Sequence, residues 1–295
     1  MSTTERDSLS IRLMPVLFVW LWSTGFIGAK YGLPYAEPFT LLAVRMLITL
    51  AALGALALFM RARWPGMTLA GHTALVGVLI HGLYLGGVFY AIDGGMPAGL
   101  ASLIVGLQPL LTSLAAVAFL GERVRWQQWL GLALGLCGVM LVLWEKLGSV
   151  SGSFPLWTLA WVLVSLVGIS LGTVYQKRFC VGVELIPATF IQYCAALAFF
   201  AVGAFWLETR VIDWQLPFVL ALGWLVLGLS VGAILLLMAL IRRGAASQVA
   251  SLFYLVPPVT ALQAYLLFDE RFGPLAILGG LMTVAGVALV VVRRT

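Results

Sequence analysis

The feature that most constrains this chain is its division into long apolar stretches, separated by short segments that hold most of its charges. About 20 predominantly apolar residues are needed to cross the roughly 30 Å hydrocarbon core of a bilayer, and each stretch has about that length. The stretches lack the in-and-out alternation of barrel strands, so they predict helices. We expect ten of them, near residues 13–30, 39–60, 69–91, 97–119, 126–144, 155–176, 186–207, 216–241, 245–267 and 274–292.

The composition supports a membrane protein and excludes several other classes. Of the 295 residues, 62% are hydrophobic and 9% are charged, whereas about a quarter of the residues in a soluble domain are charged. The excess of basic residues is spread over short loops, which gives no nucleic-acid surface. The three cysteines form no metal or disulfide pattern, and no catalytic motif is present. We therefore expect no enzyme activity, no cofactor and no metal, with the lipid bilayer and a small-molecule substrate as partners.

The distribution of basic residues predicts the orientation of the spans. Positively charged loops stay on the cytoplasmic side of the membrane. With the N-terminus inside, twelve of the seventeen Lys and Arg residues fall inside and four fall outside, while Arg45 lies within the second span. An even number of spans also returns the C-terminus to the inside. The chain is thus expected to be a multi-pass protein of a bacterial inner membrane, with both termini cytoplasmic.

The two halves of the chain share landmarks at a separation of about 148 residues. The matched pairs are Pro109 with Pro257, Thr112 with Thr260, Glu122-Arg123 with Glu270-Arg271, Gly131 with Gly279, and Gly138 with Gly286. Residues 1–147 and 148–295 are thus expected to form two five-helix repeats, and because five is odd, the second repeat enters the membrane inverted. Inverted repeats are typical of transporters that alternate between two related conformations. A single chain of this kind is expected to function as a monomer.

The sequence resembles the EamA-like branch of the drug/metabolite transporter superfamily over essentially its whole length. The residues that carry the resemblance are Leu21–Phe26 with Lys30, Ala43-Val44-Arg45, Leu120–Arg123 with Gly131 and Gly138, and Phe268–Arg271 with Gly279 and Gly286. The resemblance implies an inner-membrane carrier that exports small metabolites through a cavity between the halves. Within the family, the resemblance favours amino-acid exporters of the YddG type.

Ionisable and polar side chains inside the spans are the first candidates for substrate binding, because they are costly to place in lipid. Arg45 could reach the outer interface, or it could attract a substrate carboxylate in the cavity. Lys30 and Lys177 end related spans, either as favourable cations at helix C-termini or as residues at the two mouths. His81 and Tyr84 share a helical face that either packs or lines the cavity.

Further candidates come from stripes of aromatic and hydroxyl side chains at helical spacing, which serve either packing or binding. These candidates are Trp20, Ser23, Trp161, Tyr175 and Tyr254. Gln108 is added because Gln108-Pro109 and Pro257-Pro258 interrupt corresponding spans, and paired interruptions point to a transporter's binding site.

The spans hold no Asp or Glu that could exchange a proton for a cation, which weighs against a multidrug cation exporter. Aromatic stripes together with basic residues suit amino acids or other metabolites that carry a carboxylate. The sequence therefore predicts an exporter of amino acids, aromatic or neutral, that works by alternating access. The alternative is an exporter of lipophilic drugs or nucleoside-like compounds.

Overall fold

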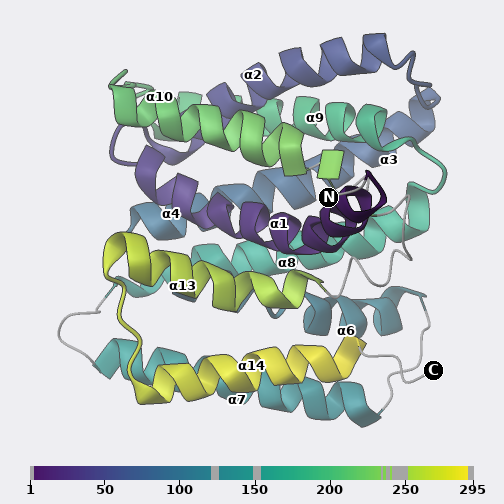
Figure 1. Cartoon of the computed structure of the whole chain (residues 1–295). Coiled ribbons are helices and arrows are strands. Elements are labelled where there is room, and N and C mark those ends of the chain that lie inside the picture. The colour runs from purple at the N-terminus through teal and green to yellow at the C-terminus, as the bar shows by residue number, and fades with distance from the viewer. Residues whose placement is uncertain are drawn as a thin grey trace.

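A computed structural model describes residues 3–120, 126–148, 154–233, 235–236, 240 and 252–291. The described chain is built from helices (Figure 1). In order they are α1 (Thr3–Gly32), α2 (Pro38–Phe59), α3 (Met67–Gly77), η1 (Val78–Leu83), α4 (Tyr84–Asp93), α5 (Ala98–Val105), α6 (Gln108–Leu120), α7 (Trp126–Gly148), α8 (Leu156–Phe179), α9 (Leu185–Leu207), α10 (Leu216–Gly223), η2 (Trp224–Ala233), η3 (Phe253–Leu255), α13 (Val256–Phe268) and α14 (Pro274–Val291).

The helices agree with the expected spans, and the all-α membrane fold is confirmed. Seven apolar helical segments of the described chain are long enough to cross a bilayer, and three shorter apolar helices complete the series. The shorter ones are Trp129–Glu145, Val256–Phe268 and Pro274–Leu289. The expected start of the ninth span, 245–251, lies outside the described residues.

Helices α2 and α9 run antiparallel, and their ends are joined by two equivalent contacts. At one end, Glu37 Oε2 accepts a hydrogen bond from the Arg210 backbone N–H at 3.1 Å. At the other end, Glu184 Oε2 accepts one from the Arg63 backbone N–H at 3.2 Å. Residues 37 and 184 are 147 apart, and so are 63 and 210. The second contact therefore repeats the first with the two halves of the chain exchanged.

Helices α7 and α14 form a second reciprocal pair and lie side by side along one edge of the molecule (Figure 1). A Cβ on Gly138 would lie 2.4 Å from the Gly279 carbonyl oxygen, and a Cβ on Gly279 would lie 2.4 Å from the Gly138 carbonyl oxygen. One heptad away, a Cβ on Gly286 would lie 2.5 Å from the Gly131 carbonyl oxygen. Glycine is required here because the two backbones touch, as in other closely packed membrane helices.

Two π-helical segments, η1 and η2, interrupt corresponding spans. The stretch from Gly77 reads GVLIHGLYLGG and the stretch from Gly223 reads GWLVLGLSVGA, so the two match at a separation of 146 residues. Each π segment begins one residue after its glycine. π-Helical segments are rare in proteins, and those that occur are often found at functional sites.

Buried or partly buried carboxylates satisfy the backbone at the starts of three helices. Glu208 accepts hydrogen bonds from the backbone N–H groups of Phe39 and Thr40, each at 2.7 Å. Glu270 serves the start of α5, and Glu145 serves the start of α14. A helix N-terminus has N–H groups without partners and a partial positive charge, so a carboxylate there is stabilised.

The glycine contact between α7 and α14 gives a stability prediction. We expect Gly279→Val to lower the melting temperature of the purified protein in detergent by about 5 °C or more, because the added side chain would force two backbones apart. The neighbouring Gly280→Val is the control, because a Cβ at Gly280 would meet nothing within 4 Å. Equal melting temperatures for the two variants would contradict this packing.

Candidate functional site

A cavity of about 230 Å³ lies among α1, α2, η1, α4, α8, α9 and η2. Its walls are mostly apolar and aromatic, with Trp22 and Phe26 from α1 and Phe89 from α4. A small number of polar side chains reach it from α2, η1, α4, α8 and α9. An apolar pocket with a few convergent polar groups is the usual form of a small-molecule site.

Arg45 of α2 is the charged residue of the cavity wall. Its side chain is buried, with the residue 3% exposed, and its Nε and Nη2 atoms donate to Ser230 Oγ at 3.2 and 3.1 Å. Its third nitrogen, Nη1, is buried and has no hydrogen-bond partner in the described chain. A buried guanidinium with a free donor is costly unless an anion completes it. This geometry can bind a carboxylate.

His81 and Gln192 form a second polar pair in the lining of the cavity. His81 Nε2 lies 3.2 Å from Gln192 Oε1, and the Tyr193 ring meets the His81 ring edge-on with centroids 4.6 Å apart. The Tyr193 hydroxyl donates to Ser230 Oγ at 3.4 Å. A chain of polar contacts thus runs from Arg45 through Ser230 and Tyr193 to His81.

Two pairs of polar residues at or beside the cavity occupy corresponding places in the two halves of the chain, whereas the position that corresponds to His81 holds Leu227. Arg45 and Gln192 are 147 residues apart, the separation that relates the contacts of α2 and α9. Tyr84 and Ser230 are 146 residues apart, the separation that relates the two π segments. The cavity is therefore symmetric in its positions and asymmetric in its charge.

Four of the residues predicted for the site lie at cavities. Arg45, His81 and Tyr84 line the main cavity. Gln108 lines a smaller neighbouring cavity of about 50 Å³, which shares Tyr84 with the first. There the break between α5 and α6 meets the start of α13, because a Cβ on Gly106 would lie 2.7 Å from the Pro257 ring. The two proline interruptions thus come together at this smaller cavity.

Two predicted residues of α1 lie away from the cavities. Trp20 is 47% exposed on the outside of the bundle and meets Trp224 edge-on. Ser23 is buried and donates to the Val19 and Val256 carbonyl oxygens. Trp22, on another face of the same helix, lines both cavities instead.

The stripe on α8 packs against the span that contains η1 and α4. Trp161 stacks on Tyr90 with ring centroids 4.9 Å apart. Tyr175 accepts or donates a hydrogen bond with His72 Nδ1 at 2.8 Å. A Cβ on Gly168 would lie 2.9 Å from the Leu79 carbonyl oxygen, so this stripe forms a close helix contact. Neither aromatic residue of the stripe lines the described cavities.

The two predicted lysines lie at the ends of their helices, outside the cavities. Lys30 Nζ is 2.5 Å from Glu270 Oε1 and lies over the Phe268 ring. Lys177 is exposed near the end of α8. The side chain of Tyr254, the last candidate, lies outside the described part of the structure.

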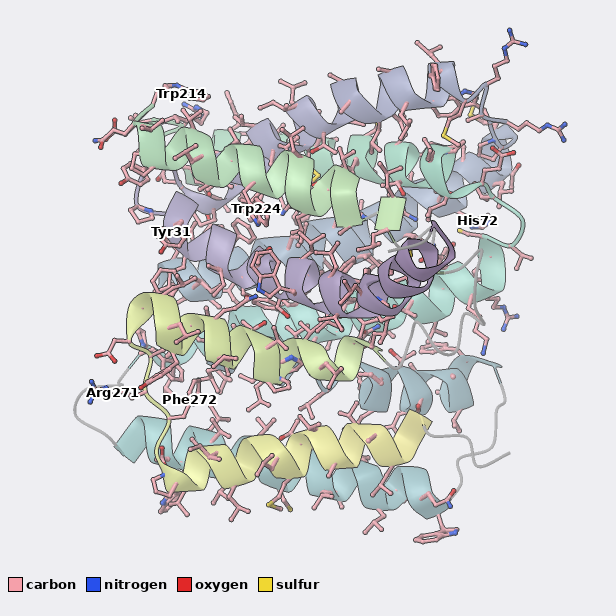
Figure 2. All side chains as sticks on the ribbon, in the orientation of Figure 1. Tyr31, His72, Trp214, Trp224, Arg271 and Phe272 are labelled. Atoms are coloured by element: carbon pink, nitrogen blue, oxygen red, sulfur yellow. The ribbon has the colours of Figure 1, made fainter. Side chains whose placement is uncertain are left out.

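The bundle has two distinct ends (Figure 2). Tyr31, Trp214 and Arg271 mark one end, and His72 marks the other. The first end holds the contacts of Lys30 with Glu270 and of Glu208 with the start of α2. Fully buried side chains lie beneath these contacts, including Ala29, Leu42 and Ala91. This end is closed, while the cavity extends along α8 and α9 toward the other end, as far as Gln176 and Leu185.

Sequence reasoning missed Gln192, Tyr193 and Ser230. Each is an isolated polar residue within an apolar span, where such residues often serve only helix packing, so the residue type alone does not indicate a site. A usable signal was the repeat, since Gln192 occupies the position in the second half that Arg45 occupies in the first.

Apolar spans, corresponding halves and a central cavity define a membrane transporter. The model of the EamA-like transporter family matches residues 10–144 and again residues 156–292, and the chain belongs to this family. The two matches show that the chain carries an internal repeat.

Several curated proteins are similar to the chain. The uncharacterized transporter YvbV of Bacillus subtilis is 28% identical over 94% of this chain and 90% of its own length. A probable amino-acid metabolite efflux pump of Escherichia coli is 26% identical over 93% and 92%. A probable terminal-alkyne amino-acid exporter of Streptantibioticus cattleyicolor is 30% identical over 68% and 66%. A solved crystal structure, 21% identical with a TM-score of 0.62, covers 94% of both chains and has the same fold.

The contact between Arg45 and Ser230 predicts a graded effect on transport. We expect Ser230→Ala to raise the substrate concentration for half-maximal transport several-fold, because two guanidinium donors lose their acceptor and the fork loses its orientation. Tyr193→Phe, which removes only the 3.4 Å contact to Ser230, should have a smaller effect. Counterflow in proteoliposomes measures both. A larger effect of Tyr193→Phe would show that Ser230 does not position Arg45.

Proposed function

We propose that this protein exports small metabolites that carry a carboxylate, with aromatic or neutral amino acids as the first candidates, by alternating access around the Arg45 cavity. The observation that carries the proposal is the free Nη1 of Arg45 in a largely apolar cavity. Arginine suits carboxylate recognition because its planar fork can donate two parallel hydrogen bonds. The aromatic walls give an apolar side chain a stacking surface.

The relatives support the same substrate class. Two of them carry names that refer to export of amino acids or their metabolites. The apolar share of the walls also suits lipophilic drugs or nucleoside-like compounds, which therefore belong in the same transport assay. If the protein transports such compounds and no carboxylate, the proposed substrate class is wrong and the protein is an exporter of drugs or nucleoside-like compounds.

We infer that residues 1–147 and 148–295 form two repeats related by a pseudo-twofold axis in the membrane plane. The reciprocal contacts of α2 with α9 and of α7 with α14 support this relation, because corresponding helices meet antiparallel with exchanged partners. Exchanging the conformations of two such repeats turns a cavity that opens to one side into one that opens to the other.

The proposed orientation of the protein in the membrane rests on the basic residues of the loops. The charge distribution supports an orientation with the Lys30 end outside and both termini in the cytoplasm of a bacterial cell. The conformation described above is then closed outside, with its cavity directed toward the cytoplasm. This is the state in which an exporter loads its substrate.

Replacing Arg45 tests the proposal directly. We expect Arg45→Gln to lower counterflow of the transported amino acid at least about tenfold, because a hydrogen bond to a charged group contributes about 1.5 to 3 kcal/mol. The melting temperature in detergent should stay the same or rise, because a buried charge lacking a full set of partners is removed. Arg210→Gln, at the exposed end of α9, is the control. Undiminished transport by Arg45→Gln would exclude Arg45 as the carboxylate ligand.

Removal of the ion pair between Lys30 and Glu270 is expected to shift the protein from the conformation closed at this end toward the one that is open there. In a variant whose native cysteines are replaced, a cysteine at the buried Ala29 should react slowly with a membrane-impermeant maleimide added outside. We expect Lys30→Met to speed this labelling several-fold, because the closed end loses its ion pair. Arg271→Met, which alters an exposed ion pair at the same end, is the control. Unchanged labelling by Lys30→Met would exclude a role in closure.

A further inference from the structure

We propose that the site selects a ligand with one net negative charge: a monocarboxylate with an apolar body and no ionised amino group. The inference rests on the proposed function and narrows its substrate class. It predicts that 2-oxo, N-acylated or deaminated relatives of apolar amino acids bind better than the zwitterionic amino acids themselves. Two features of the cavity support this selectivity: the sum of its charges, and the hydrogen-bond donor Arg45 Nη1, which has no partner.

The spans hold no carboxylate that could neutralise Arg45. All eleven acidic residues lie at helix ends or in the segments between spans, and residues 214–268 contain none at all. Five of the eleven are engaged at helix ends, where they accept hydrogen bonds from backbone N–H groups, namely Glu37, Glu145, Glu184, Glu208 and Glu270. The partner of Arg45 in the structure is the neutral hydroxyl of Ser230.

Net charge then decides which ligand the cavity stabilises most. With the His81 imidazole neutral, a monoanion beside Arg45 makes the loaded cavity neutral. A zwitterion leaves the total at one positive charge, because its ammonium replaces the charge that its carboxylate neutralises. In surroundings of low dielectric constant, an uncompensated charge is expensive, and two nearby cations repel each other.

The hydrogen-bonding groups of the cavity favour the same choice. An ammonium needs up to three acceptors. Ser230 Oγ already accepts from Arg45, and Gln192 Oε1 is within hydrogen-bond distance of His81 Nε2. Among the cavity side chains, the fully buried atom without a partner is a donor, Arg45 Nη1. The site therefore has a place for an anion, while its best acceptors are occupied.

The apolar walls define the rest of the ligand. Trp22, Phe26, Phe89, Ile169 and Leu229 surround the cavity from three spans and η2. A second carboxylate or an amino group that lies against these apolar side chains would be buried without a partner. A hydrocarbon or aryl body gains from the same burial.

Three compounds with one apolar body and different charges test the inference. They are 3-phenylpropanoate, phenylalanine and phenethylamine, which carry net charges of about −1, 0 and +1 near neutral pH. Binding to the purified full-length protein in detergent is measured as the concentration that gives half of the maximal thermal stabilisation. We expect 3-phenylpropanoate to act at a concentration at least about tenfold lower than phenylalanine, and phenethylamine to give no stabilisation.

Arg45→Gln supplies the matched control. It should abolish the preference for 3-phenylpropanoate while the protein stays folded, as judged by its melting temperature without ligand. Phenylalanine that binds as well as 3-phenylpropanoate, or better, would overturn this inference and leave the proposed export of amino acids intact. Failure of both carboxylates to bind, with the protein folded, would overturn the inference and the proposed function together.

Discussion

Every charge and backbone polar group of this chain must be satisfied without help from lipid, and this constraint organises the whole structure. Carboxylates occur at the ends of helices, where backbone N–H groups need an acceptor, as Glu208 and Glu270 illustrate. Arg45 is the exception, because it lies within a span and keeps one donor free. Among the described residues, Arg45 is the charged side chain that has a buried nitrogen without a partner, and the proposed binding of a carboxylate rests on this atom.

The packing of the two halves brings that chemistry to the centre. Glycines allow α7 and α14 to touch, and glutamates tie the ends of α2 to the ends of α9. Corresponding helices thus meet each other, α7 with α14 and α2 with α9, and the second pair brings corresponding residues to the cavity. Arg45 and Gln192 occupy such a pair of positions, so a symmetric framework supports a site with one charged side and one neutral side.

The fold could be predicted from the sequence because lipid imposes a simple rule on span length and apolarity. The lining of the cavity was predicted where a side chain was conspicuous in an apolar run, as with Arg45 and His81. It was missed where the decision depended on which face of a helix points inward. Helix α1 is apolar on most sides, so nothing in its sequence favours Trp22 over Trp20. Ser230 and Gln192 resemble ordinary packing residues until the partner helix is known.

The matched π segments also affect the backbone beside the cavity. Both begin one residue after a glycine, within stretches that share five of their eleven residues. A π-helical turn replaces the regular hydrogen bonds to the fourth preceding residue with bonds to the fifth. The two turns supply Ile80, His81 and Leu229 to the cavity lining, so the wall is irregular in backbone at matching places of the two halves.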